Sequence, residues 1–393
     1  MPRSQLPKIL CVVGARPNFM KIAPIMAALR SPAAVGGTDL KSVPPAGPAP
    51  AAAFEAVLVH TGQHYDPAMN ESFFEDLGIP APNINLEVGS STHAVQTAEI
   101  MRRFEPVLDA EEPAAILVVG DVNSTIACAL VAAKKGVPVV HVEAGLRSYD
   151  RDMPEEINRV LTDQISDLLF TTERGALDNL KREGIDPERV HFVGNVMIDS
   201  LMRSLEKATP SAATLASAGL NVPEAGYALL TLHRPSNVDD PEVLARLLDT
   251  FRDIADRLPV VFPMHPRTRA RIESAGLQGR LEHPGLHRLP PINYLAMLGL
   301  MRDARMVLTD SGGIQEETTA LGVPCITLRN NTERPITAEE GTNVVVGQDP
   351  QRILASVDDI LQTGGKAGRV PEYWDGKAAE RIVAVLRATY RSS

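Results

Sequence analysis

A turn of small residues followed by two acids is the strongest chemical signal in this sequence. The turn, 311–313, follows an apolar run at 306–308 that predicts a buried strand, and a predicted helix comes next. A strand, a small-residue turn and a helix present free N–H groups and the positive end of a helix dipole to an anion. Glu316 or Glu317, about one turn into the helix, is placed to accept hydrogen bonds from a sugar diol. The pattern favours a nucleotide diphosphate, and the structural alternative is that Ser311 only caps the helix.

Basic residues near two predicted turns fit the same ligand. Arg16 and Lys21 lie five residues apart at the end of the first predicted strand, and Arg334 follows the diglycine turn closely in sequence. Guanidinium and ammonium groups at the carboxyl end of a parallel strand are suited to phosphate. The alternative for Arg16 and Lys21 is a solvated surface pair.

Three carboxylates follow strands of the first half of the chain. Asp121 and Glu143 come at strand ends, and Glu155 opens a helix. Each has a structural alternative: Asp121 could bond loop N–H groups or cap the next helix, Glu143 could pair with Arg147, and Glu155 could favour the positive end of its helix dipole and pair with Arg159 at i+4. Together they predict carboxylates crowded at one sheet edge, where each raises the pKa of the others, so that a proton donor and an acceptor coexist near neutral pH.

Two histidines end successive strands of the second half. His233 follows the predicted strand 227–232, and His265 follows 259–264. A single histidine after a strand is usually a structural hydrogen-bonding group, but two at neighbouring strand ends favour a functional site. None of these groups has the ligand spacing of a zinc site, so we expect no metal and no cofactor.

The element pattern predicts two doubly wound Rossmann-like α/β domains that face a central cleft. Apolar strands alternate with amphipathic helices along the whole chain. We place the first domain at 1–203, with a C-terminal helix at about 376–393 packing back onto it, and the second at 204–375, with a hinge near 200–206. The predicted strands are 8–13, 55–60, 115–119, 138–142, 167–171, 190–193, 227–232, 259–264, 306–309 and 323–328; predicted helices include 17–30, 68–77, 92–107, 124–135, 154–165, 173–183, 241–257 and 313–321.

Composition narrows the class of protein. The 393 residues carry a formal net charge of −10, which argues against nucleic acid as the main partner. No run approaches the roughly 18 apolar residues of a membrane helix, and the N-terminus does not resemble a signal peptide. The three cysteines lie in apolar segments without paired spacing. We therefore expect a cytoplasmic protein with reduced cysteines and no membrane partner.

Taken in order, these motifs strongly resemble the non-hydrolysing UDP-N-acetylglucosamine 2-epimerases. The resemblance runs from about residue 8 to 390 and implies the two-domain GT-B architecture, a homodimer, and the supply of UDP-N-acetylmannosamine for bacterial surface polysaccharides. The segments that carry it are Gly14-Ala15-Arg16-Pro17, Thr61-Gly62-Gln63-His64, Gly120-Asp121, His141-Val142-Glu143-Ala144-Gly145-Leu146-Arg147, Pro154-Glu155-Glu156-Ile157-Asn158-Arg159, Asp310-Ser311-Gly312-Gly313-Ile314-Gln315-Glu316-Glu317 and Thr332-Glu333-Arg334-Pro335.

The resemblance implies a role for each matching residue. Acid–base roles fall on Asp121, Glu143, Glu155 and His233. Phosphate and uridine contacts fall on Arg16, Lys21, Ser311, Gly312, Gly313 and Arg334, with Glu317 on the ribose hydroxyls. A uracil pocket falls near 292–297 and includes Met297, although many relatives carry glutamine where this chain has Ile292. Arg159 and His265 complete the predicted substrate contacts.

The implied reaction is inversion at C2 of UDP-N-acetylglucosamine, by anti-elimination of UDP to 2-acetamidoglucal and re-addition. A modified UDP-sugar of the diacetamido uronic acid type is the alternative substrate. A GT-B glycosyltransferase, a hydrolysing epimerase and a catalytically silent nucleotide-sugar-binding protein are rival functions. The residues do not select the exact sugar or the carboxylate that removes the C2 proton.

One region departs from the family pattern. Some bacterial members are activated by substrate bound near the Gln63–His64 motif. Here Asp66 and Glu99 stand where those members carry glutamine and arginine. Because two acids would repel a second nucleotide sugar, we expect this activation to be weak, absent or differently built.

Overall fold

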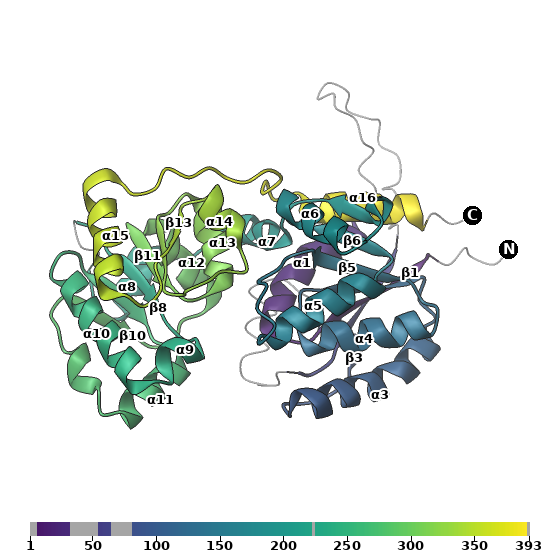
Figure 1. Ribbon diagram of the computed structural model, residues 1–393, viewed down its shortest axis with the longest axis horizontal. Helices are drawn as coiled ribbons and strands as arrows, with labels where there is room; N and C mark the ends of the chain where they lie inside the picture. The colour runs from purple at the N-terminus through teal and green to yellow at the C-terminus, as the bar shows by residue number, and fades with distance from the viewer. Residues whose placement is uncertain (1–5, 32–53, 64–80, 222–224, 391–393) are drawn as a thin grey trace, which may run out of the picture. The chain divides into compact units, whose positions relative to one another are not determined.

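Two compact units make up the computed structural model of the chain (Figure 1). It describes residues 6–31, 54–63, 81–221 and 225–390. Unit 1 comprises Met1–Ser200 and Asp375–Ser393, and unit 2 comprises Leu201–Trp374. The first boundary lies inside helix α7 (Val196–Leu205), within the segment predicted as a hinge. Bending there stays a prediction.

Unit 1 is built on a seven-stranded parallel sheet with the order β3-β2-β1-β4-β5-β6-β7. Its central strands are continuous apolar runs, and all five residues of β4 are buried, as expected where helices cover both faces of a sheet. The strands are β1 (Lys8–Val13), β2 (Glu55–His60), β3 (Ile84–Asn85), β4 (Ala115–Val119), β5 (Val139–Ala144), β6 (Leu168–Thr171) and β7 (Val190–Phe192).

Unit 2 is built on a six-stranded parallel sheet with the order β10-β9-β8-β11-β12-β13. This is the 3-2-1-4-5-6 order of a Rossmann fold. The strands are β8 (Ala228–Thr231), β9 (Val260–Pro263), β10 (Leu286–Leu289), β11 (Met306–Thr309), β12 (Cys325–Thr327) and β13 (Asn343–Val345).

Helices cover each sheet. In unit 1, α3 packs on α4, α4 on α5, and the C-terminal α16, yellow in Figure 1, on α1. In unit 2, α10 packs on α15, and α12 on α8 and α13. Unit 1 contains α1 (Arg16–Arg30), α3 (His93–Glu111), α4 (Asn123–Lys134), α5 (Pro154–Ile165), α6 (Arg174–Arg182), η1 (Pro187–Arg189), the first half of α7 and α16 (Ala378–Thr389). Unit 2 contains α8 (Ser211–Ser217), α9 (Pro235–Val238), α10 (Pro241–Ala255), α11 (Pro266–Ser274), η2 (Gln278–Leu281), α12 (Tyr294–Asp303), α13 (Gly312–Leu321), α14 (Pro335–Glu339) and α15 (Pro350–Thr363).

The predicted fold class, two doubly wound parallel α/β domains, is confirmed. Three strands escaped the sequence prediction: β3 and β13 are only two and three residues long, and β10 is polar at its centre. The helix predicted at 68–77 lies outside the described residues. Among the described residues, no helix is both long and apolar enough to span a bilayer.

The strand order reverses direction once in each sheet. In unit 1 the reversal lies between β1 and β4, and in unit 2 between β8 and β11. Doubly wound sheets bind ligands at such switch points, beyond the carboxyl ends of the strands. The loops after these four strands and the helices that they lead into carry eight of the fourteen residues predicted to be functional: Arg16, Lys21, Asp121, His233, Ser311, Gly312, Gly313 and Glu317.

Candidate active site

The switch point of unit 1 is fixed by side chains that tie its loops together. The Asn18 side-chain oxygen accepts from the backbone N–H of Ala15 at 2.9 Å, and its amide donates to the carbonyl of Val119 at 2.8 Å. A Cβ on Gly14 would lie 2.0 Å from Oγ of Ser124, so only glycine fits there. The turn after β1 is thereby held against the end of β4 and the start of α4.

Asp121 follows β4 and forms an ion pair with Arg159 of α5. Arg159 is buried and also pairs with Glu156. Although burial opposes its charge, the carboxylates of Asp121 and Glu156 hold the pKa of Arg159 above its usual value. The side chain of Asn158 donates to the Asp121 carbonyl at 2.9 Å. Both the backbone carbonyl and the side chain of Asp121 therefore bind residues of α5.

Glu143 lies in β5 and pairs with Lys21 of α1, with both side chains buried. Its φ of +74° is in the left-handed region, at a register shift between β5 and β6. Non-glycine residues held in this region are strained and concentrate at functional sites. A Cβ on Gly120 would lie 3.0 Å from Lys21 Nζ and 3.2 Å from Glu143 Oε2. The pair thus lies against the turn that carries Asp121.

Three structural alternatives raised by the sequence are wrong. Asp121 does not cap α4, whose N-cap is Val122. Glu143 does not pair with Arg147, which pairs instead with Asp163 at 2.7 Å and with Glu183.

Glu155 does not pair with Arg159 because Glu156 takes that place. The Glu156 carboxylate is already fixed by N–H groups of Ser148 and Tyr149, each at 3.0 Å. Glu155 is half-buried in the first turn of α5, and its side chain makes no hydrogen bond or ion pair with the residues that the structure describes.

The expected electrostatic arrangement of these acids also needs correction. The sequence predicted carboxylates that crowd and repel one another. The structure instead pairs Asp121 and Glu143 each with a cation, because Arg159 and Lys21 reach the sheet edge from α5 and α1. Both cations were themselves predicted to bind substrate.

In unit 2, Asp310 organises the switch point. It is fully buried at the end of β11 and accepts backbone N–H groups of His233 at 2.9 Å and Arg234 at 2.8 Å. His233 Nδ1 lies 2.9 Å from Oδ1 of Asp310. The side chain of Asn237 donates to Oδ2 of Asp310 at 3.1 Å. Burial acts to raise the pKa of Asp310, but His233 and these N–H groups hold it below its usual value.

His233 is therefore held by Asp310 through Nδ1, which leaves Nε2 as the nitrogen available for proton transfer. The His265 ring lies 5.4 Å from the His233 ring, centroid to centroid. His265 is exposed at the N-cap of α11, where Nδ1 accepts the N–H of Arg267 at 3.2 Å. The sequence assigned no role to Asp310, although an acid between a buried strand and the diglycine turn was a visible signal.

The buried Glu333 and Arg329 form a cluster with the partly buried Arg234 at the start of α13. Glu333 lies 2.8 Å from Arg329 and 3.5 Å from Arg234, and a Cβ on Gly312 would lie 2.8 Å from its Oε1. Burial acts to raise the pKa of Glu333, but the arginines lower it to about 2. Arg329 Nη1 and Arg234 Nε are buried and have no acceptor among the described residues.

Arg334, predicted to bind phosphate, pairs through Nε with Glu316 at 3.2 Å. Ser311 occupies the N-cap of α13, but its side chain makes no capping hydrogen bond there. Gly312 and Gly313 open the helix, as predicted. Arg234 and Arg329 were missed by sequence reasoning, because the assignments went to His233, which precedes Arg234, and to Arg334, further along the same segment as Arg329.

Glu317, predicted to bind the ribose hydroxyls, is buried in α13 and accepts the Tyr294 hydroxyl at 2.9 Å. Burial raises the pKa of Glu317 to about 7, and burial also raises the pKa of Tyr294. Tyr294 opens α12, and Met297 lies half-buried one turn further on. This hydrogen bond joins Tyr294, in the segment predicted to form the uracil pocket, to Glu317, the residue predicted to bind the ribose hydroxyls.

The side chain of Arg16, and residues His64 and Asp66, lie outside the described residues. Gln63 is buried, and its side-chain oxygen accepts from the N–H and hydroxyl of Ser124 at 3.2 and 2.7 Å. Glu99 pairs with Arg102 at 2.7 Å and Arg103 at 3.2 Å. Its charge is therefore offset, which weakens its expected repulsion of a second nucleotide sugar.

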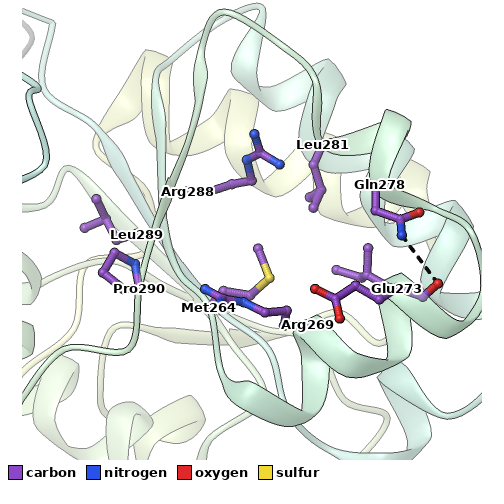
Figure 2. A pocket seen from close by; sticks show the side chains of 9 residues that line it. Met264, Arg269, Glu273, Gln278, Leu281, Arg288, Leu289 and Pro290 are labelled. Atoms are coloured by element: carbon purple, nitrogen blue, oxygen red, sulfur yellow. Dashed lines mark hydrogen bonds between the residues drawn. The ribbon is translucent and has the colours of Figure 1, made fainter.

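A separate hollow of about 350 Å³ lies in unit 2 between α11, η2 and the end of β10 (Figure 2). It is not the candidate site, because it contains none of the residues predicted to be functional. Its lining residues are Met264, Arg269, Ile272, Glu273, Gln278, Leu281, Arg288, Leu289 and Pro290.

The three cysteines are free and buried, as expected. In the part of the chain that the structure describes, no group of three or more His, Cys, Asp or Glu side chains is arranged to hold a metal ion.

The two sheets and their switch-point residues define a Rossmann-type α/β protein of the GT-B class, and comparison with known proteins narrows this further. The sequence model of the family described as UDP-N-acetylglucosamine 2-epimerase matches residues 49–387. The chain belongs to this family.

Among its relatives, the UDP-N-acetylglucosamine 2-epimerase of Methanocaldococcus jannaschii is 40% identical over 382 residues, 96% of this chain and 98% of that protein. The UDP-2,3-diacetamido-2,3-dideoxy-D-glucuronate 2-epimerase of Pseudomonas aeruginosa is 41% identical over 383 residues, 96% and 99% of the two chains. The crystal structure of the M. jannaschii enzyme in complex with UDP-GlcNAc and UDP is similar with a TM-score of 0.82 and 39% identity, covering 97% of this chain and 99% of that one.

Proposed function

We propose that this protein inverts C2 of UDP-N-acetylglucosamine to give UDP-N-acetylmannosamine, without hydrolysis. Membership of the family supports the reaction class, and the solved relative with UDP-GlcNAc and UDP supports the ligand. The observation that carries the proposal is the arginine cluster at the start of α13, where N–H groups of the partly buried Arg234 and the buried Arg329 lack acceptors among the described residues. Such groups at a helix N-terminus suit a diphosphate leaving group.

The proposed chemistry is elimination followed by re-addition. A carboxylate takes the C2 proton, the C1–C2 double bond forms, and the electron pair of the C1–O bond leaves with UDP. The neutral 2-acetamidoglucal then receives a proton at C2 on the opposite face, and UDP attacks C1. Arginine and backbone N–H groups stabilise the charge that develops on the diphosphate. The proposed diphosphate contacts in unit 2 are Arg234, Arg329, Arg334, Ser311, Gly312 and Gly313.

Asp121, Glu143 and Glu155, with His233, are the proposed acid–base groups. Lys21 and Arg159 form ion pairs that hold two of these carboxylates in place, and the side chain of Glu155 is the one without a partner among the described residues. Glu317 is the proposed acceptor for the ribose hydroxyls, with Arg16, Met297 and His265 as further substrate contacts.

The reaction also needs the two units to act together. We propose that the carboxylates of unit 1 and the diphosphate site of unit 2 bind one substrate, and that closure about α7 keeps the neutral glucal from leaving. We also propose a homodimer located in the cytoplasm. Sedimentation measures the subunit number directly, and a dilution series from micromolar to nanomolar tests whether the dimer is stable.

Reaction in deuterium oxide tests the chemistry. The purified protein is incubated with UDP-N-acetylglucosamine alone, without any sugar acceptor, and followed by proton NMR. We expect UDP-N-acetylmannosamine with deuterium at C2. Product with hydrogen retained at C2 contradicts proton removal by a group in exchange with solvent, and stoichiometric UDP with a free sugar favours a hydrolysing enzyme.

A second candidate substrate is a diacetamido uronic acid linked to UDP. The P. aeruginosa relative named for that substrate is 41% identical to this chain. A panel of UDP-sugars, compared by kcat/KM for inversion at C2, separates the candidates. A higher value for the uronic acid reassigns the substrate and leaves the proposed reaction class intact.

A further inference from the structure

A buried histidine joins the three segments that carry the proposed acid–base carboxylates. His141 lies in β5 with no exposed surface. Its Nδ1 is 2.7 Å from Oδ1 of Asp163 on α5, and its Nε2 is 2.9 Å from the carbonyl oxygen of Gly120 after β4. The ring therefore connects the strand of Glu143, the turn of Asp121 and the helix of Glu155.

The two partners define the protonation of the ring. A backbone carbonyl only accepts hydrogen bonds, so Nε2 must donate to Gly120. Asp163 is held as an acceptor on its other oxygen, which receives the N–H of Gly145 at 3.0 Å and lies 2.7 Å from Arg147. These donors favour the carboxylate form of Asp163, so Nδ1 must also donate. A ring that donates from both nitrogens is an imidazolium.

The surrounding charges balance a cation at this position. The charged groups that face the network are Asp163, Arg147 and Glu183, whose carboxylate lies 2.5 Å from Arg147. Two carboxylates and one guanidinium leave one negative charge, which the imidazolium neutralises. The Lys21–Glu143 pair lies on the other side of Gly120 and is neutral in itself.

Residues of β5 hydrogen-bond to both backbone polar groups of Gly120. Its N–H donates to the carbonyl of Val142 at 3.1 Å, and its carbonyl accepts from His141. Gly120 has a φ of +69°, a conformation that costs little only for glycine and needs neighbours to select it. The direction of the next residue, Asp121, follows from this fixed turn.

We propose that His141, as an imidazolium, is a positioning residue that sets the placement of Asp121, Glu143 and α5 relative to one another. The proposal rests on the proposed epimerase function for its kinetic consequence but not for the charge state of the ring. His141 touches no reacting atom in this scheme and acts through Gly120 and Asp163.

The charge state is tested in the whole, wild-type protein by ¹⁵N NMR of histidine-labelled material at pH 7. Both His141 nitrogens should resonate as protonated, with His141→Gln identifying the signals. His60 is an internal reference for a neutral ring, because burial lowers its pKa to about 4. One unprotonated nitrogen in the His141 ring overturns the proposal, whether or not the protein turns over any UDP-sugar.

The positioning role is tested with two variants that each keep one bond. The amide of His141→Asn reaches the position of Nδ1 and keeps Asp163, whereas that of His141→Gln reaches the position of Nε2 and keeps Gly120. We expect His141→Asn to lower kcat roughly 100-fold, the loss typical of a misplaced catalytic group, and His141→Gln to lower it less. UDP affinity, which depends on unit 2, should change by less than about twofold in both.

A merely structural role gives a different pattern. It would lower the melting temperature of both variants and leave kcat per folded molecule near the wild-type value, and that result overturns the positioning role. If wild-type protein inverts no UDP-sugar, the proposed function fails, while the NMR measurement still decides the protonation of His141.

Discussion

At the residue scale, the candidate site is a set of charge pairs in which structural and chemical roles are divided between neighbours. Glu156 and Glu155 are adjacent in sequence. Glu156 is buried, pairs with Arg159 and accepts two backbone N–H groups, whereas Glu155 is half-buried at the start of the helix. Arg159 shares its guanidinium between the buried Glu156 and the more exposed Asp121. Removing one partner therefore has different effects depending on which is removed.

Asp121→Asn should separate activity from stability. The Glu156–Arg159 pair remains, so the free energy of unfolding should change by less than about 1 kcal/mol. We expect kcat to fall roughly 100-fold or more, because Asp121 is one of the proposed acid–base groups. Arg159→Met is the matched variant: it leaves Glu156 buried without its cation and should lower the free energy of unfolding by about 3 kcal/mol in urea denaturation. Equal stability losses in the two variants would contradict this division.

Glu333 and Glu317 should give unit 2 opposite pH dependences. The folded pKa of Glu333 is about 2, below 4.5, so its stabilisation is present above pH 4.5 and is lost as the pH falls toward 2. The folded pKa of Glu317 is about 7, above 4.5, so stability is lost as the pH rises from 4.5 to 7. Each shift corresponds to about 3 kcal/mol.

We therefore expect Glu333→Gln to be destabilising at pH 7 and near neutral at pH 2.5, and Glu317→Gln to be stabilising at pH 8 and near neutral at pH 4. Urea denaturation across this range measures both effects. The two variants carry the same substitution in the same unit, so each is the control for the other. Parallel pH profiles would show that burial and arginine contacts do not set these pKa values.

The sequence identified candidate functional residues, but it did not predict their partners. Motif order located Asp121, Glu143 and Glu155, because the acids follow recognisable strands. It could not predict that Glu143 meets Lys21 or that Asp310 anchors His233, because these partners are 122 and 77 residues apart in the chain. The local alternatives, such as Glu143 with Arg147, failed for the same reason: pairing depends on strand order, which sequence spacing does not contain.

At the scale of elements, close packing of loops onto helices holds each switch point. The end of β1 approaches α4 so closely that a Cβ on Gly14 would lie 2.6 Å from the Ser124 Cβ as well as 2.0 Å from its Oγ. Long apolar strands and helices were predicted well, whereas β3 and β13 were missed because so few residues carry no periodic pattern. The sequence alone did not predict the strand order, and therefore did not predict the contact between Gly14 and Ser124.

Gly14→Ala should lower the free energy of unfolding by about 2 kcal/mol or more, because a methyl group has no space against Ser124. Adding Ser124→Gly removes the obstructing side chain, and the alanine should then cost less than about 1 kcal/mol. Ser124→Gly alone gives the cost of losing its bonds to Gln63 and Thr61. Additive effects of the two substitutions, measured by urea denaturation, would contradict a direct clash.

At the scale of the whole molecule, we expect simple saturation by substrate. Initial rates of inversion at C2 should follow a hyperbola with a Hill coefficient of about 1 over two decades of UDP-N-acetylglucosamine. The expectation now rests mainly on the departure from the family pattern at Asp66, because Glu99 is neutralised by its two arginines. A clear sigmoid would contradict it.

Gln63→Ala is an unsuitable probe of such activation. The side chain of Gln63 is a buried support for Ser124, so its removal would disturb the packing beside Gly14 as well as any second site. Glu99→Gln is the better variant, since this residue lies on the outer part of α3 and its partners are exposed.

The assembly of unit 1 has a consequence during protein synthesis. Its last helix, α16, buries Ile382, Val383 and Leu386, and its first backbone N–H groups donate to Asp199 at 3.1 and 2.7 Å. The ribosome makes this helix only after all of unit 2, so the rest of unit 1 keeps apolar surface uncovered in the nascent chain until α16 has been made. A stop codon after Trp374 should therefore harm the distant unit rather than the adjacent one. Limited proteolysis of that truncated chain should cut within 8–200 before it cuts within 201–374, and the reverse order would show that unit 1 does not depend on its late-made helix.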